Sequence, residues 1–276
     1  KIWIIACGTA GYAGQIGAKY NARIARQPVE IDIASEFRYR DPLVSDKMAV
    51  LAISQSGETA DTLAAMAEGR KRGAKLWANI NMIGSQAMRI ADGYISMQTG
   101  PEIGVASTKA YTAPVVNLYM LAILLGELRG TLDDNTRRAL VAERSHVPEW
   151  VSACLQREAE VLEVAKALKD ITHCLYLGRG INVSTAYEGA LKLKELSYIH
   201  AEGYPAGEMK HGPIALVDED MPVIVVAPQD ELYEKMISQI EQAKARGGKV
   251  VAVATEGDEL IPTLADHVLW VPKTPE

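Results

Sequence analysis

The stretch KMAVLAISQSGETADTLAAMAEGRKRGAKLWANI at 47–80 decides the fold. It begins with the aliphatic run VLAIS at 50–54, continues into a helical pattern at 57–72, and ends in a second run, LWANI, at 76–80. Both runs are apolar on both faces, which is typical of strands in a parallel sheet that helices cover on both sides. Gly73 directly follows the helical pattern and suits a helix C-terminus. The stretch therefore predicts a β–α–β unit.

Four segments of the first half of the chain recur in the same order in the second half. The pairs are 2–10 with 174–182, 47–54 with 220–227, 72–80 with 246–254, and 91–97 with 265–271. The offset stays between 172 and 174 residues, so we infer a duplicated unit. Each copy reads as a βαβαβ layer. The predicted fold class is α/β, with two doubly wound parallel-sheet domains related by internal duplication.

The copies set the expected domain boundaries. We expect domain 1 at 1–135, a helical connector at 136–165 and domain 2 at 166–276. After its last matched strand the first copy continues into a loop and a long apolar helix, whereas the second stops within five residues. We therefore expect the second domain to be truncated at its C-terminus, with its last helix and tail missing. The opening KIWIIACG enters a strand at once, as if the chain were cut from a larger protein.

Composition excludes several classes of protein. The chain has 276 residues, of which 48% are apolar and 23% charged, so it can bury enough surface to fold. Its net charge of −6 argues against a general binder of nucleic acid or of membrane surfaces. The longest apolar stretch, 113–126, is shorter than the roughly 20 residues that cross a bilayer. We expect no nucleic-acid partner and no membrane span.

The three cysteines, Cys7, Cys154 and Cys174, form an odd set without CxxC spacing. This pattern favours neither a disulfide framework nor a zinc site. Buried free thiols in a reducing compartment fit it better, so we expect a cytoplasmic protein.

The loop SQSGET at 54–59 carries the strongest chemical signal. It follows a predicted strand and precedes a helix, so backbone N–H groups and the helix dipole favour an anion there. Its candidate anion-binding side chains are Ser54, Gln55, Ser56 and Thr59. One alternative is a simple helix N-cap, in which Ser56 or Thr59 satisfies the first N–H groups of the helix. An N-cap needs one hydroxyl group, whereas this loop has three, an amide and a glycine, so we favour a phosphate site.

Two further loops should reach the same edge of the sheet. Thr9 follows the first strand, and Ser107 and Thr108 precede the long apolar helix. Ligands of open α/β sheets bind outside the carboxyl ends of the strands. Hydroxyl groups with few aromatic residues suit a sugar phosphate better than a nucleotide, and neither GxGxxG nor a Walker loop occurs, so we expect no cofactor.

The segment 187–213 contains the candidate acid–base groups. Glu188, Lys192 and Glu195 share one helix face by their spacing, which equally fits a solvated ladder of ion pairs. As a site, a carboxylate beside the lysine would move a proton between adjacent carbons, and Lys192 would stabilise the enediolate oxygen. Glu188 is a candidate substrate-binding residue. His211 lies between glycines and suits ring opening, although lone histidines are usually structural.

The other histidines carry less signal. His200 competes with His211, but it lies in an apolar, helical context, so we expect it to be packed. No set of His, Asp and Glu has metal-ligand spacing, so we expect no metal.

Several segments together resemble the glutamine–fructose-6-phosphate aminotransferase (isomerising) family, the glucosamine-6-phosphate synthases. The segments are ACGT at 6–9, SEFRYR at 35–40, SQSGETADT at 54–62, EIGVASTKAYT at 102–112, LGRG at 177–180, EGALKLKELSYIHAE at 188–202 and AGEMKHGP at 206–213. The resemblance spans the isomerase half of that family, which is built from two sugar-isomerase (SIS) domains. It implies conversion of fructose 6-phosphate and glutamine-derived ammonia into glucosamine 6-phosphate.

The resemblance also implies roles for single residues. Ser54, Gln55, Ser56 and Thr59 match the phosphate loop, while Thr9, Val105 and Ser107 match neighbouring sugar-phosphate contacts. Glu195 matches the base that carries the proton between C2 and C1, and Lys192 assists it. His211 matches the ring-opening histidine that the partner subunit supplies, which implies a homodimer.

This chain departs from the family pattern in three places. Ala10 stands where the family usually has Ser, which removes one hydroxyl group near the phosphate. The N-terminal glutaminase domain expected in the full protein is not in this sequence, nor is the tail lysine that forms an imine with the sugar. A non-catalytic sugar-phosphate regulator of the SIS type and a related SIS deglycase or isomerase remain as alternatives.

Overall fold

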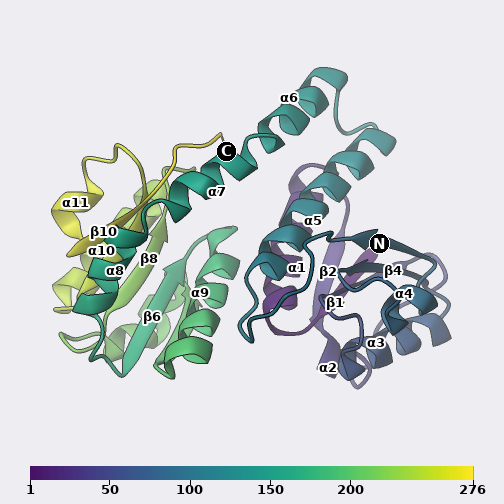
Figure 1. Ribbon diagram of the computed structural model, residues 1–276, viewed down its shortest axis with the longest axis horizontal. Coiled ribbons are helices and arrows are strands. Elements are labelled where there is room, and N and C mark those ends of the chain that lie inside the picture. Colours follow the sequence, from purple (N-terminus) through teal and green to yellow (C-terminus); the bar gives the residue numbers. More distant parts are fainter. Residues whose placement is uncertain (276) are drawn as a thin grey trace. The chain divides into compact units, whose positions relative to one another are not determined.

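The structure is a computed structural model that describes residues 1–275. The chain divides into two compact units, Lys1–Val141 and Ala142–Glu276. Each unit contains one five-stranded sheet in which every pair of neighbouring strands is parallel (Figure 1). The predicted α/β class with two parallel-sheet domains is therefore confirmed.

The first unit, drawn from purple to teal in Figure 1, has the strand order β2-β1-β3-β4-β5. Its strands are β1 (Ile2–Ala6), β2 (Val29–Ile33), β3 (Ala49–Ser54), β4 (Lys75–Ile80) and β5 (Gly93–Ser96). Its helices are α1 (Gly8–Arg23), α2 (Ala34–Phe37), α3 (Ala60–Lys71), α4 (Gln86–Ile90) and α5 (Lys109–Leu128).

The second unit has the strand order β10-β9-β8-β6-β7. Its strands are β6 (His173–Gly178), β7 (His200–Pro205), β8 (Val223–Ala227), β9 (Val250–Thr255) and β10 (His267–Val271). Its helices are α7 (Val147–Leu155), α8 (Glu158–Ala167), α9 (Asn182–Ser197), α10 (Tyr233–Ala245) and α11 (Ile261–Leu264), with short 3₁₀ helices η1 (Ala206–His211) and η2 (Pro213–Leu216). Numbered by order of appearance, both sheets read 2-1-3-4-5, as a duplication requires.

The βαβαβ prediction was too short, because each unit has five strands. The missed strands include β2 (VEIDI) and β7 (HAEGYP), which are edge strands whose polar residues mask the apolar signal. His200 is the first residue of β7, and its side chain is 66% exposed. The expectation that His200 is packed in a helical context was wrong, because the helix ends at Ser197 before Tyr198 turns the chain with φ of 63°.

Two glycines end equivalent helices in the two units. Gly73 follows α3 with φ of +88°, and its N–H donates to the carbonyl of Arg70 at 2.9 Å. Gly247 follows α10 with φ of +83°, and its N–H donates to the carbonyl of Lys244 at 2.9 Å. Both positions need the left-handed backbone that glycine adopts without steric cost, and the first confirms the helix end predicted at Gly73.

An aspartate that recurs in both copies joins a helix end to two strands. In the first unit, Asp92 accepts the Leu76 N–H at 2.7 Å and a hydrogen bond from Arg70 at 2.9 Å. In the second unit, Asp266 accepts the Val250 N–H at 2.7 Å and hydrogen bonds from Lys244 at 2.8 Å. The recurring Ala-Asp of the repeat is therefore a structural device that ties the fourth strand to the helix before it.

Helix α5 has a length that the sequence analysis underestimated. It spans 20 residues and is long and apolar enough to cross a membrane by length and composition alone. The prediction from 113–126 that the apolar stretch is too short to cross a bilayer was therefore wrong. Helix α5 packs on α1, where a Cβ on Gly17 would lie 2.5 Å from Leu118 Cδ1. Leu118 is fully buried in the core beneath the sheet, which fits the core helix of a folded domain.

The expected connector at 136–165 is helical throughout most of its length. It contains most of α6 (Asp134–Arg144), all of α7 and most of α8, and Pro148 lies in the first turn of α7. Proline is tolerated there because the first N–H groups of a helix have no partner within it. The division between the two compact units falls inside α6. The domain boundaries at 135 and 165 stay predictions.

The predicted burial of the cysteines was wrong for two of the three. Cys174 is buried, and its burial raises the pKa of the thiol to about 12. Cys154 is exposed and Cys7 is half-buried. Cys7 lies in the connection between β1 and α1, next to Thr9, and is therefore only half-buried.

Candidate functional site

The candidate site of the first unit lies where the strand order reverses. The chain leaves β1 toward β2 on one side and returns to β3 on the other, so the loops after β1 and β3 diverge from neighbouring strands. Such a switch point opens a crevice at the carboxyl edge of a parallel sheet. Thr9 follows β1, and the loop at 54–59 follows β3, as the sequence predicted.

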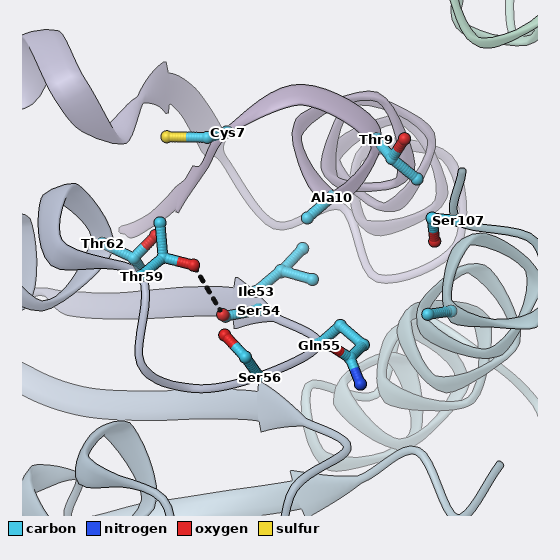
Figure 2. A pocket seen from close by; sticks show the side chains of 11 residues that line it. Cys7, Thr9, Ala10, Ile53, Ser54, Gln55, Ser56, Thr59, Thr62 and Ser107 are labelled. Atoms are coloured by element: carbon cyan, nitrogen blue, oxygen red, sulfur yellow. Dashed lines mark hydrogen bonds between the residues drawn. The ribbon is translucent and has the colours of Figure 1, made fainter. Parts of the chain in front are cut away.

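A cavity of about 210 Å³ occupies this crevice (Figure 2). Its lining residues are Cys7, Thr9, Ala10, Ile53, Ser54, Gln55, Ser56, Thr59, Thr62, Ser107 and Ala110. The structure thus brings together six predicted ligand-binding residues from three separate loops. Figure 2 shows the hydroxyl groups of Ser54, Ser56 and Thr59 gathered together, with Thr9 and Ser107 across the cavity from them.

The loop at 54–59 holds its hydroxyl groups through its own backbone. Ser54 Oγ accepts the Gly57 N–H at 3.0 Å, and Ser56 Oγ accepts the Glu58 N–H at 3.2 Å. Ser54 and Thr59 are joined by a hydroxyl–hydroxyl contact of 3.4 Å. Accepting a hydrogen bond uses a lone pair and leaves the hydroxyl proton able to donate to an anion.

Gly57 has no substitute in this loop. Its φ is +65°, and a Cβ there would lie 2.2 Å from Ser85 Oγ. Its carbonyl accepts the Ala87 N–H at 2.9 Å, while the Gln55 carbonyl accepts N–H groups from Asn81 and Met82. The loop is therefore fixed to the neighbouring β4–α4 connection before any ligand binds.

The N-cap alternative requires Ser56 or Thr59 to accept one of the first N–H groups of α3. Thr59 is the N-cap residue of α3, yet within the described residues its side chain makes no capping hydrogen bond. The first N–H groups of a helix have no partner within it, and an anion can satisfy them. Ser56 Oγ accepts the N–H of Glu58, which precedes the helix, so neither Ser56 nor Thr59 acts as the N-cap that this alternative requires.

The loop before α5 places Ser107 in the cavity wall, whereas Val105 of the same loop does not line the cavity. Thr108 Oγ1 donates to Glu102 at 3.1 Å, and Ser107 lines the cavity. The Val105 side chain is fully exposed and does not line the cavity. A substrate contact by Val105 stays a prediction. The sequence analysis missed Glu102, because no local pattern links it to Thr108 six residues later.

The acid–base candidates of the second unit form one cluster on α9. Lys192 Nζ lies 3.4 Å from Glu188 Oε1 and 2.5 Å from Glu195 Oε2. The Glu188 side chain is 8% exposed, whereas that of Glu195 is 34% exposed. In a solvated ladder of ion pairs, every charged side chain would be exposed to solvent. Glu188 is buried, so the cluster is not a ladder of this kind.

His211 ends η1, whose Met209 packs in the same core as α10 and buried side chains of β8. Ala190 and Leu193 of α9 belong to a separate core of the second unit. His211 and Glu195 are both exposed, and they belong to elements that pack in these two different cores.

No group of three or more His, Cys, Asp or Glu side chains within residues 1–275 is arranged to hold a metal ion.

Comparisons with known proteins bear on this geometry. The model of the SIS domain family matches residues 1–124 and 167–276. The chain is 51% identical over 273 residues to the glutamine–fructose-6-phosphate aminotransferase [isomerizing] of Thermus thermophilus, covering 99% of this chain and 45% of that protein. It is 49% identical to the enzyme of that name from Bacteroides thetaiotaomicron, covering 99% and 44%. The chain thus spans less than half the length of these curated relatives.

A solved structure agrees with these sequence relatives. The C-terminal domain of glucosamine-fructose-6-phosphate aminotransferase from Francisella tularensis matches with a TM-score of 0.95 at 38% identity. The match covers 99% of this chain and 78% of that one. The fold and the order of the elements are therefore shared over nearly the whole chain.

Proposed function

Because this chain belongs to the SIS domain family, we propose that it is the isomerase module of an enzyme that converts fructose 6-phosphate and glutamine-derived ammonia into glucosamine 6-phosphate. The observation that carries the proposal is the cavity at the β1/β3 switch point, where three loops present hydroxyl groups beside the N-terminus of α3. The names of the relatives support the substrate class.

In this proposal the phosphate ester binds at 54–59. Ser54, Ser56 and Thr59 donate hydroxyl hydrogen bonds, and the unpartnered N–H groups of the first turn of α3 add theirs. The helix dipole favours the dianion without a basic side chain. Gln55 and Thr9 complete the polar lining, so the ester is held by local groups in a chain whose net charge is −6.

The proton transfer is assigned to α9. Glu195 is the base that moves a proton between C1 and C2 of the open-chain sugar, through an enediol-type intermediate. Lys192, 2.5 Å from that carboxylate, stabilises the negative oxygen that develops on the sugar. Glu188 is buried on the other side of Lys192 and holds the ammonium in place.

Replacing Glu195 by Gln tests this assignment in the complete natural protein. Exchange of deuterium at the sugar carbon should fall at least a thousandfold, while the affinity for fructose 6-phosphate stays within about threefold, because the phosphate loop is untouched. The matched control is Glu163→Gln, which removes an exposed Glu–Lys pair of 2.7 Å on α8 and should change neither quantity. Unchanged exchange in Glu195→Gln would instead favour a sugar-phosphate sensor.

We also propose that the protein acts as a homodimer. η1, which ends at His211, and α9, which carries Glu195, pack in different cores of the second unit. This supports a site in which the partner subunit supplies His211. Sedimentation should therefore give twice the chain mass. A monomer with full isomerase activity would contradict the dimer.

The remaining parts of the proposal concern the whole protein. We propose an N-terminal glutaminase domain, because the curated relatives that match this chain are more than twice as long. We also propose a cytoplasmic location, which the three free cysteines support.

A further inference from the structure

Two helix N-termini contribute to the cavity of the first unit, and they differ in whether a carboxylate of the chain binds their N–H groups. Helix α3 begins after the hydroxyl loop, whose acidic residue, Glu58, accepts the N–H of Gln86 at 2.7 Å on the neighbouring α4. Helix α5 begins after Ser107 and Thr108, and Ser107 and Ala110 line the cavity. Both termini attract anions in principle.

A carboxylate of the chain itself occupies the N-terminus of α5. Glu102 Oε2 accepts the Ala110 N–H at 2.9 Å and the Thr108 N–H at 3.3 Å. Glu102 Oε1 accepts the Thr108 hydroxyl at 3.1 Å. These hydrogen bonds hold the pKa of the Glu102 carboxyl below its usual value, and the bond from the Ala110 N–H has the largest effect. The carboxylate is thus charged at neutral pH.

The same loop is fixed at its other end by a buried amide. Asn81 Nδ2 donates to the Gly100 carbonyl at 2.6 Å, and Asn81 Oδ1 accepts from the Thr99 N–H and hydroxyl at 3.2 and 3.0 Å. Asn81 follows β4 and is 8% exposed. The segment from Thr99 to Ala110 is therefore held at both ends by side chains, which fixes where Ser107 faces.

We propose that Glu102 is a positioning residue that sets the direction in which a sugar phosphate enters the cavity, an inference that rests on the proposed function. Its carboxylate satisfies the N-terminus of α5 and repels a second anion there, so the ester is directed to α3. Ser107, held beside it, then meets the hydroxyl-bearing end of the sugar. Glu102 acts through the Thr108 and Ala110 backbone and touches no reacting atom.

The test compares two probes, fructose 6-phosphate and inorganic phosphate, by calorimetry on the natural protein and on Glu102→Gln. The amide keeps the size of the side chain but loses the charge and one acceptor. We expect the Kd of fructose 6-phosphate to rise about tenfold, because the sugar end loses its fixed partner, while the Kd of inorganic phosphate changes less than twofold. Hydrogen exchange at the Thr108 and Ala110 amides should quicken.

The matched control is Glu127→Gln, at the other end of α5, where Glu127 forms one ion pair with Arg137 at 3.5 Å. It should change neither Kd. Equal weakening of both probes in Glu102→Gln would indicate general destabilisation and overturn the positioning role, as would no change in either. Failure of the natural protein to prefer fructose 6-phosphate over inorganic phosphate would overturn the proposed function and this inference with it.

Discussion

The two switch points of this protein have the same topology and different chemistry. Gly8 after β1 and Gly180 after β6 both have a positive φ, +53° and +56°, so a left-handed glycine follows the first strand of each unit. At the fixed offset of the repeat, Ser54 of the first unit corresponds to Ala227 and Thr59 to Leu232. Each replacement removes a hydroxyl group that lines the first cavity.

The second switch point is also filled. A Cβ on Gly180 would lie 2.6 Å from Leu232 Cδ1, so the side chain that replaces the Thr59 hydroxyl packs over the start of α9. Asp230 stands where the first unit has Gly57, and its carboxylate accepts the Leu232 N–H at 2.8 Å. An apolar side chain and a negative charge both oppose binding of a phosphate.

On the first helix of each unit the difference is reversed, because here the second unit carries the polar residues and the first unit the apolar ones. Ile16 and Tyr20 of α1 correspond by offset to Glu188 and Lys192 of α9. In the first unit this face is apolar, and Tyr20 stacks edge-on with Tyr119 of α5 at 5.2 Å. In the second unit the same face carries the charged cluster. The two copies therefore differ in chemistry on the same fold: the first has the hydroxyl loop and the second has the charged helix face.

Converting the first switch point into the second should produce the largest effect. The double variant Ser54→Ala, Thr59→Leu carries the residues of the second unit and removes two hydrogen bonds to a charged group, each worth about 1.5–3 kcal/mol. We expect the Kd of fructose 6-phosphate to rise at least a hundredfold in calorimetry. Ser152→Ala on the exposed surface of α7 is the control and should bind normally. Retained binding would mean that the phosphate lies elsewhere.

The shared aspartates allow a test of what the two units have in common. Hydrogen bonds from the Leu76 N–H and Arg70 lower the pKa of Asp92. For Asp266, burial opposes this effect, but bonds from Lys244 and the Val250 N–H still lower the pKa. A lowered pKa in the folded state stabilises the protein above the unfolded value of about 3.9, and that stability is lost as pH falls below it.

We expect Asp92→Ala to reduce the free energy of unfolding by about 1–2 kcal/mol at pH 7, because the Leu76 N–H loses its acceptor. As the pH falls below the unfolded value, the difference from the natural protein should shrink, because its own Asp92 gains a proton. Asp266→Ala should behave alike in denaturant titrations. A difference between natural protein and variant that does not depend on pH would contradict the linkage.

A restored hydroxyl group at position 10 should have the smallest effect. Ala10 lines the cavity beside Thr9, so Ala10→Ser adds one donor toward the phosphate. A net hydrogen bond of about 0.5–1.5 kcal/mol predicts a Kd lower by roughly two- to tenfold. Asn182→Ser at the equivalent position of the second unit is the control and should leave the Kd unchanged. Weaker binding by Ala10→Ser would mean that the cavity has no room for another polar atom.

Much of the site was predictable because its residues follow strands directly. A parallel strand ends at a known edge of its sheet, so Thr9, Ser54 and Thr59 could be placed together from the strand pattern alone. Glu102 could not, because its partners are set by the path of an irregular loop. Edge strands β2 and β7 were not predicted, because the prediction relied on runs that are apolar on both faces, whereas both of these strands contain polar residues.

By itself, the amino-acid sequence determined the duplication, the parallel α/β class, the glycine-ended helices and the loop of hydroxyl groups at 54–59. These are properties of local pattern and of spacing, which the chain carries wherever it folds. The tertiary structure alone decided that Thr59 is not a side-chain cap, that Glu102 occupies the N-terminus of α5, and that η1 and α9 pack in separate cores of the second unit. Those facts depend on which groups distant in sequence meet in space, and local propensity does not specify such meetings.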